Sequence, residues 1–249
     1  MVDIHTHVLP GVDDGSADLE MSLDMLEMSQ ASGVSVVVAT PHCNIPGEFD
    51  NYASAALKNN FGRLKAEAKR LGIAVTLCYG MEVYTTPEVP ELIRRKKIWT
   101  LNGSSYMLME FAFNEDPDFT YDIIADIRKL GIKPVIAHPE RYFFVQDDPQ
   151  TAFNWCTSGC ALQINKGSLL GAFGRGPEET ARLIIEHGLA ACVASDAHSP
   201  VQRTTHMSEV SRYLEIEYGE EYQRLLLEVN PKRILQNKDL YGYEPVPFY

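Results

Sequence analysis

Short apolar runs rich in β-branched residues alternate with helix-like stretches along the chain, and this alternation restricts the possible folds more than any other feature. We expect strands over residues 2–7, 35–40, 74–84, 106–111, 133–139, 160–165 and 189–198. Helices are expected between them, over residues 18–32, 51–71, 90–97, 120–130, 149–157 and 177–187, and after them over 207–217, 220–227 and 231–236. Strands joined in this way by helical crossovers run parallel in one sheet.

The length of 249 residues allows either one large α/β barrel or two small domains. Seven β-α units in succession favour a barrel related to the (β/α)₈ type over two dinucleotide-binding domains. No G-x-G-x-x-G follows the first expected strand, which weakens the dinucleotide interpretation further. We therefore expect one α/β barrel domain over residues 1–249.

The charge balance is acidic, with 34 Asp and Glu against 22 Lys and Arg and a formal net charge of -12. A nucleic-acid partner or an anionic membrane surface would require a basic face, so neither is expected. We find no signal peptide and no apolar run long enough to cross a membrane. Five cysteines without a C-x-x-C pair indicate reduced thiols, and hence a cytoplasmic location.

Histidine, aspartate and glutamate recur where the expected strands end. His5 and His7 end the first strand, and their spacing places both side chains on the same side of it. Nine positions share this placement at strand ends or in the loops beside them: His5, His7, Asp14, His42, Glu82, Glu110, His138, Asp196 and His198. In a β/α barrel these ends converge on one mouth, so the nine side chains are expected to meet there.

Taken singly, a strand histidine is most often a hydrogen-bonded core residue and a glutamate a salt-bridge partner. The joint placement is the informative signal, because clustered carboxylates repel one another unless cations neutralise them. Imidazole and carboxylate ligands without a thiolate suit zinc, manganese or iron. The sequence therefore predicts a centre for divalent ions of this kind.

The usual nucleophile motifs are missing. There is no Cys-x₅-Arg phosphate loop, no G-x-S-x-G elbow and no P-loop. Cys43 lies beside His42 in the sequence, but a small buried hydrophobe is the simpler role for it. A covalent enzyme intermediate is therefore not expected.

The chain resembles the bacterial polymerase-and-histidinol-phosphatase superfamily, and within it the manganese-dependent protein-tyrosine phosphatases of capsule and exopolysaccharide operons. The motifs that carry this resemblance are HTHVLPGVDDG, TPHC, GMEVY, LMEF, AHPERY and SDAH followed by RTTHM, and it extends to NPKRILQNK near the C-terminus. The resemblance implies a distorted (β/α)₇ TIM-like barrel with three divalent metal ions. Manganese is the expected metal, with iron and zinc as alternatives.

Matched motif by motif, the resemblance also implies a role for each site residue. The first ion would be held by His5, His7, Glu82 and Asp196, the second by His42 and His138 with Glu82 bridging, and the third by Asp14, Glu110 and His198. Asp13 is the alternative to its neighbour Asp14. Arg141 in HPERY and Arg203 after SDAH match phosphate-contacting arginines.

The leading hypothesis is a metal-dependent protein-tyrosine phosphatase. A phosphate dianion entering an acidic protein needs local positive charge, which divalent ions together with Arg141 and Arg203 would supply. A metal-activated water would attack phosphorus, and tyrosinate, with a pKa of about 10, is a better leaving group than a serine alkoxide. The resemblance alone implies the partner, a phosphotyrosine protein that is the tail of a bacterial tyrosine autokinase.

Three other functions are considered. A phosphatase for a small phosphomonoester such as histidinol phosphate would use the same metals. The acidic charge opposes a nuclease, and Glu110 stands where a related amidohydrolase commonly has a bridging lysine. A metal-stabilised interaction module would not need an open cluster of ligands. The sequence leaves open the oligomeric state and any role for Tyr241, Tyr243 and Tyr249 in the Pro-rich C-terminal segment.

Overall fold

The computed structural model describes residues 1–242 and 244–249. Its strands are β1 (Val2–Thr6), β2 (Val36–Ala39), β3 (His42–Cys43), β4 (Thr76–Tyr79), β5 (Glu82–Tyr84), β6 (Tyr106–Glu110), β7 (Lys133–Ala137), β8 (Ala161–Asn165) and β9 (Ala190–Ala194). Its α-helices are α1 (Leu19–Ala31), α2 (Ala55–Arg70), α3 (Val89–Arg94), α4 (Pro117–Lys129), α5 (Phe143–Asp147), α6 (Gln150–Thr157), α7 (Lys166–Leu169), α8 (Arg175–Glu186), α9 (Ser208–Tyr218), α10 (Glu220–Arg224) and α11 (Asn230–Leu235). The tighter or wider turns are η1 (Leu101–Gly103), η2 (Pro139–Arg141) and η3 (Leu225–Val229).

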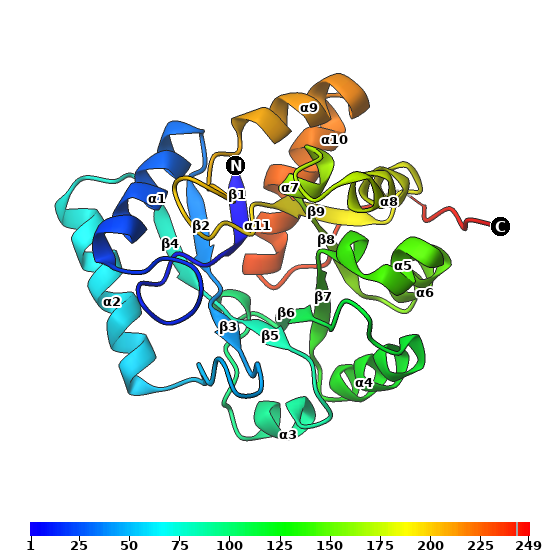
Figure 1. The fold of residues 1–249 in the computed structure, drawn as a ribbon, viewed down its shortest axis with the longest axis horizontal. Helices are drawn as coiled ribbons and strands as arrows, with labels where there is room; N and C mark the ends of the chain where they lie inside the picture. The colour runs from blue at the N-terminus through cyan, green and yellow to red at the C-terminus, as the bar shows by residue number, and fades with distance from the viewer. Residues whose placement is uncertain (243) are drawn as a thin grey trace.

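The strands form a distorted, TIM-like barrel in which every strand pair is parallel. One sheet has the order β1-β2-β4 and the other β3-β5-β6-β7-β8-β9. An isolated parallel bridge between Thr6 and Ala197 joins the end of β1 to the segment after β9. Figure 1 shows the strands in the centre and most helices around them, so the predicted α/β barrel is confirmed.

The expected strand over residues 74–84 is wrong in one respect, because the structure divides it into β4 and β5. The neighbouring strand is divided in the same place, between β2 and β3. Pro41 lies in that gap and has no N–H to donate to a ladder. Opposite it, Gly80 packs so closely that a Cβ would lie 2.9 Å from Leu101. The two breaks separate the two sheets and account for the distortion of the barrel.

Helix starts follow the capping residues. Asp18 accepts a hydrogen bond from the N–H of Met21 and so caps α1. The expected helix 51–71 begins only at Ala55, because Ser54 caps α2. The expected helix 120–130 begins earlier, at Pro117, because Asp116 caps α4 and proline suits the first helical position.

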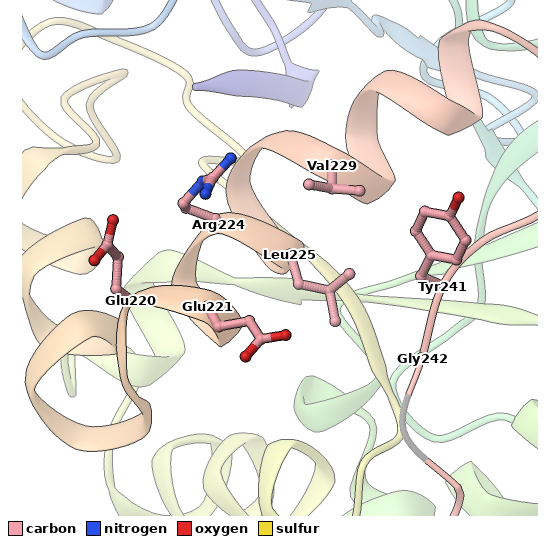
Figure 2. Close-up of a pocket in the computed structure, with 7 residues that line it drawn as sticks. All are labelled: Glu220, Glu221, Arg224, Leu225, Val229, Tyr241 and Gly242. Carbon is pink, nitrogen blue, oxygen red and sulfur yellow. The ribbon is translucent and has the colours of Figure 1, made fainter.

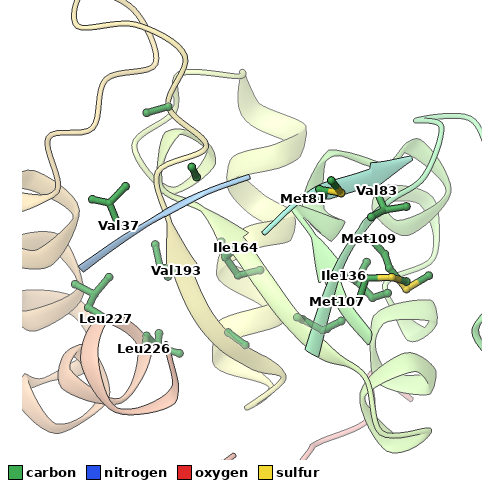
Figure 3. Close-up of a cluster of buried hydrophobic side chains, with 14 of the residues drawn as sticks. Val37, Met81, Val83, Met107, Met109, Ile136, Ile164, Val193, Leu226 and Leu227 are labelled. Carbon is green, nitrogen blue, oxygen red and sulfur yellow. The ribbon is translucent and has the colours of Figure 1, made fainter. Parts of the chain in front are cut away.

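The core has two layers. The interior cluster fills the barrel below its mouth, and its members include Val2, Ile4, Val38, Leu108, Val135 and Ala194. A second cluster packs the outer faces of the strands against the helices, and Figure 3 shows part of it, including Met109, Ile136, Val193 and Leu227. Continuous apolar strands are therefore buried on both faces, as expected for a parallel sheet.

All five cysteines are free thiols, as expected. Within the described residues, no helix has both the length and the apolar character needed to cross a membrane. Part of the C-terminal segment packs on the body of the protein, since the Val246 N–H donates to the His187 carbonyl and the Phe248 ring stacks on the His187 ring. Tyr243 lies outside the described residues.

Candidate metal centre and arginine pair

Strand β1 carries His5 and His7 to the mouth through a local irregularity. Its pairing with β2 shifts by one residue over positions 3–6. Ile4 belongs to the interior cluster, yet the next residue, His5, also faces inward and places its Nδ1 2.8 Å from Gln163 Oε1. A bulge of this kind re-aims side chains at the rim of a barrel. Both histidines therefore face the site, as predicted.

Glu82 lies at the centre of the cluster. Its Oε1 is 3.0 Å from His138 Nε2 and 3.2 Å from His5 Nε2. Its Oε2 is 3.0 Å from His42 Nδ1 and 3.2 Å from His7 Nε2. One carboxylate thus contacts four imidazoles from three strand ends.

The other predicted ligands complete the same cluster. Asp196 Oδ1 is 3.4 Å from His5 Nε2 and 3.7 Å from His198 Nδ1. Glu110 approaches from β6, with its Oε1 3.6 Å from His138 Nε2. Asp14 Oδ1 lies 3.4 Å from the Nε2 atoms of both His42 and His198. All nine side chains predicted from the strand ends therefore meet at one mouth.

The neighbouring aspartates Asp13 and Asp14 occupy different environments. The Asp13 side chain is fully buried and its Oδ2 is 2.9 Å from His7 Nδ1. Asp13 also accepts the backbone N–H groups of Gly15 and His42. The Asp14 side chain is 54% exposed and reaches the histidines from the solvent side. This geometry makes Asp13 an orienting group and leaves Asp14 available to a cation.

The imidazoles are oriented as in metal sites. Nδ1 of His5, His7 and His198 lies within 3.0 Å of Gln163 Oε1, Asp13 Oδ2 and the Asp196 carbonyl, respectively. With the proton on each Nδ1, each Nε2 presents a lone pair to the centre. The Nε2 atoms of His5 and His7 face each other at 3.3 Å, where a shared cation would remove the repulsion of two lone pairs.

Among the residues that the structure describes, several buried polar atoms at the centre find no hydrogen-bond partner, which is rare in proteins unless an ion or water satisfies them. They are His42 Nδ1, Glu82 Oε2, His138 Nδ1 and His198 Nε2. Three groups have ligand atoms within 4.8 Å of one another: His7, Asp14, His42 and His198; His5, His7 and Asp196; and His42, Glu82 and Glu110. The residues therefore fit divalent cations.

The crowding of charged groups shifts the pKa values of Glu82 and Glu110 in opposite directions. Burial opposes ionisation of Glu82, but the facing imidazoles of His5 and His42 outweigh it and hold the pKa of Glu82 well below its usual range. Burial and the nearby charges of Glu82 and Asp196 raise the pKa of Glu110 well above its usual range. A bound cation would favour the ionised form of Glu110 and relieve this repulsion.

Arg141 and Arg203 lie beside the cluster and approach one oxygen atom. Arg203 Nη2 is 2.6 Å and Arg141 Nη1 is 3.5 Å from Asp196 Oδ2. The Arg141 guanidinium lies between two aromatic rings, 4.8 Å from the centroid of Phe113 and 4.4 Å from that of Phe173. The structure thus brings both predicted arginines to the mouth.

Left-handed backbone conformations direct three of these side chains. His138 has φ 33°, Asp196 has φ 49° and Arg203 has φ 50°. Such conformations are costly for residues other than glycine and cluster at functional sites. The barrel therefore maintains local strain where the site is built.

A family model for capsular polysaccharide synthesis, CpsB/CapC, matches residues 1–236. The chain belongs to the CpsB/CapC family. Tyrosine-protein phosphatase YwqE of Bacillus subtilis is 33% identical to it over 247 residues, which cover 99% of this chain and 96% of the relative. Tyrosine-protein phosphatase CpsB of Streptococcus agalactiae is 32% identical over 242 residues, with 95% and 99% coverage. The resemblance inferred from the motifs is confirmed.

Solved structures agree with this membership. A chain from the crystal structures of YwqE from Bacillus subtilis and CpsB from Streptococcus pneumoniae, described as unique metal-dependent tyrosine phosphatases, superimposes with a TM-score of 0.93. It is 32% identical, and the match covers 100% of both chains. A lactonase from Listeria monocytogenes superimposes with a TM-score of 0.65 at 13% identity, covering 96% of this chain and 95% of the lactonase, and shows only that the fold is shared.

Some groups of this CpsB/CapC site were not predicted from sequence. Glu140 lies in the motif AHPERY but was given no role there, and Phe173 carries no motif and reaches the arginines only through the fold. Gln163 and Asn165 lie in the segment QINKGSL, where β8 ends and α7 begins. Gln163 contacts His5, and Asn165 Nδ2 donates to Asp196 Oδ2 at 2.6 Å, so both support the site.

Two cavities differ in their relation to this site. A cavity of about 540 Å³ adjoins Arg203 and Phe173, and Lys166 also lines it. A larger one, of about 680 Å³, lies between α10 and the C-terminal segment (Figure 2). Figure 2 shows Glu220 and Arg224 on the helical side and Tyr241 across from them. None of the nine predicted ligands lines that cavity, so it plays no part in the metal centre.

Proposed function

We propose that this chain, a metal-dependent tyrosine-protein phosphatase of the CpsB/CapC family, hydrolyses phosphotyrosine with three divalent ions at the barrel mouth. The observation that carries the proposal is the convergence of imidazoles and carboxylates on Glu82, with Arg141 and Arg203 beside them. Manganese is the proposed metal, and iron and zinc are the alternatives. The proposed ligands are His5, His7, Asp14, His42, Glu82, Glu110, His138, Asp196 and His198.

The proposed distribution of ligands follows the motifs. His5, His7, Glu82 and Asp196 would hold one ion, His42 and His138 together with Glu82 would hold a second, and Asp14, Glu110 and His198 would hold a third. The two oxygens of Glu82 lie near different histidines, which supports a bridging role. When bound, the ions supply positive charge to the phosphate and lower the pKa of coordinated water, so that it can attack phosphorus near neutral pH.

The residues of the chain orient this chemistry. Asp13, Gln163 and the Asp196 carbonyl hold three imidazoles with Nε2 toward the centre. Arg141 and Arg203 bind the non-bridging oxygens of the phosphate and balance the charge that develops on them. The aromatic rings around Arg141 restrict its guanidinium to one orientation, which lowers the entropy lost on binding phosphate.

A cysteine nucleophile has no support in the structure. Burial raises the pKa of Cys43 to about 12, so its thiol is protonated at neutral pH. Cys43 is also fully buried within the outer core. Direct attack by water, without a phosphoenzyme, is therefore the proposed route.

The proposed partner is the tyrosine-containing tail of a bacterial autokinase, and the proposed location is the cytoplasm. The family description, capsular polysaccharide synthesis, supports this kind of partner. Five free cysteines suit a reducing compartment. That residues 1–249 form a single phosphatase domain stays a prediction.

Substrate class is tested by phosphate release after chelation and addition of manganese, iron or zinc. The substrates are a phosphotyrosine peptide, a phosphoserine peptide and histidinol phosphate. Metal-dependent release selective for phosphotyrosine is expected. A preference for histidinol phosphate would favour the small-molecule alternative and overturn the proposal.

Site roles are tested with three alanine variants and a matched control. Arg141→Ala and Arg203→Ala should each lower kcat by roughly 10²–10³-fold with metal content retained. His5→Ala should lower both metal content and turnover. Arg175→Ala is the control, because that arginine is 88% exposed and pairs only with Glu179 in the described part of the chain. Unchanged kinetics in an arginine variant would remove that arginine from the site.

A further inference from the structure

The short helix α7 forms hydrogen bonds with both of the loops that carry Arg141 and Arg203. It follows β8, and its first turn lies against Glu140, the residue before Arg141. Glu140 is fully buried, and its Oε1 accepts hydrogen bonds from the Asn165 N–H at 3.0 Å and from Ser168 Oγ at 2.7 Å. The loop that carries Arg141 is thereby attached to α7.

The same helix holds the other loop through Lys166. Its ammonium group donates to the carbonyl oxygens of Thr204 and His206, the latter at 2.8 Å. These two residues follow Arg203, whose backbone is in the left-handed region. A backbone this strained keeps its conformation only when its surroundings enforce it. The hydrogen bonds of Lys166 to Thr204 and His206 support the loop from outside, as does the hydrogen bond from the Thr205 hydroxyl to the Met25 carbonyl.

Burying the Lys166 side chain at this position is energetically unfavourable. It is only 7% exposed, and within the described part of the chain its hydrogen bonds go to carbonyl and hydroxyl oxygens of Thr204 and His206 and not to a carboxylate. Burying an ammonium group opposes folding, and the nearby charges of Asp3 and Glu209 offset that cost only in part, so that burial lowers the pKa of Lys166 to about 8. An apolar side chain of similar length would avoid that cost, so stability alone does not account for a lysine here.

We propose that Lys166 is a positioning residue for Arg203: by holding the Thr204 and His206 carbonyls, it keeps the guanidinium at the mouth beside Asp196. This inference rests on the proposed function, since it assumes that Arg203 binds the phosphate. Lys166 itself does not touch the substrate. Glu140 attaches the loop of Arg141 to the same turn of α7 in the corresponding way.

The test is a double-mutant cycle with Lys166→Met, which keeps the length of the side chain and removes the donors. Lys166→Met alone should lower kcat/KM for a phosphotyrosine peptide about tenfold or more, and should weaken inhibition by inorganic phosphate. It should cause no further loss in an Arg203→Ala background, because a residue that acts through Arg203 has nothing left to position. In an Arg141→Ala background the loss should persist, which provides the matched control.

Two further measurements separate positioning from a purely structural role. The melting temperature of Lys166→Met should equal or exceed that of the wild type, and its metal content should be unchanged. A lower melting temperature, or an equal loss of activity in the Arg203→Ala and Arg141→Ala backgrounds, would overturn the inference. If Arg203→Ala alone had no effect, the proposed role of Arg203 would fail as well, whereas an additive cycle would refute the role of Lys166 only.

Discussion

Exchanging Asp13 for alanine should destabilise the fold and weaken metal binding, whereas exchanging the adjacent Asp14 should impair metal binding alone. The Asp13 side chain is fully buried and accepts hydrogen bonds from His7 Nδ1 at 2.9 Å, from the Gly15 N–H at 3.1 Å and from the His42 N–H at 3.0 Å. Asp14 is 54% exposed and points at two imidazoles. Only Asp13 is therefore part of the folded framework.

The expected magnitude follows from these contacts. A protein hydrogen bond contributes roughly 1–1.5 kcal/mol net, so Asp13→Ala, which leaves three donors unpaired, should lower the free energy of unfolding by about 3–5 kcal/mol. It should also weaken metal binding by about 10–100-fold, because His7 loses the group that orients it. Asp14→Ala should stay within about 0.5 kcal/mol of the wild type and bind one ion fewer.

The assay is urea unfolding of the chelated proteins, combined with metal analysis of the reloaded proteins. Chelation matters because bound ions would themselves stabilise the native state and obscure the difference. Equal losses of stability in the two variants would refute the distinction between an orienting aspartate and a ligand. Full metal loading of Asp14→Ala would remove Asp14 from the ligand set.

Three other outcomes are expected. Phe173→Leu should raise KM for phosphotyrosine peptides several-fold with metal content unchanged, because Arg141 loses one stacking face; kinetics identical to the wild type would contradict this. Gly15→Ala should unfold more readily and lose metal, since its Cβ would lie 2.3 Å from the His7 Cβ, and a stable, loaded variant would show that the loop can move aside. Burial lowers the pKa of Lys166 from 10.5 to about 8, so between these pH values the unfolded state binds more protons than the folded state. The stability of the wild type relative to Lys166→Met should therefore rise by roughly 3 kcal/mol from pH 8 to 10.5, as measured by denaturant unfolding. A stability difference that does not change with pH would argue against a charged, buried lysine.

The ligand set could be predicted from sequence because its chemistry is local to strand ends. His5, Glu82 and Asp196 are uncommon residues at the ends of apolar runs, and parallel strands bring such ends together without any knowledge of packing. The structure confirms that they meet, since Glu82 Oε1 and Asp196 Oδ1 both lie within 3.4 Å of His5 Nε2. The barrel class followed from the same alternation of strands and helices.

Supporting residues could not be predicted, because they act across long sequence separations. Glu140 accepts hydrogen bonds from residues 25 and 28 positions away, and Lys166 donates to residues 38 and 40 positions away. Neither pair has a periodicity or a spacing that a single sequence could reveal. The break in the expected strand 74–84 was missed for a similar reason, since the tight packing of Gly80 depends on Leu101.

In strand β1, side chains alternate in direction in one phase for the hydrophobic interior and in the opposite phase for the histidine site. The interior requires Val2 and Ile4 on the inner side, and the site requires His5 there as well, which a regular strand cannot provide. The extra residue between positions 3 and 6 allows the strand to place both Ile4 and His5 on the inner side, whereas a strand without it would keep only one of them there. Deleting Asp3 would therefore leave His5 and His7 in phase with Val2 and turn Ile4 away from the interior, so the length of this segment links the hydrophobic core to the histidine site.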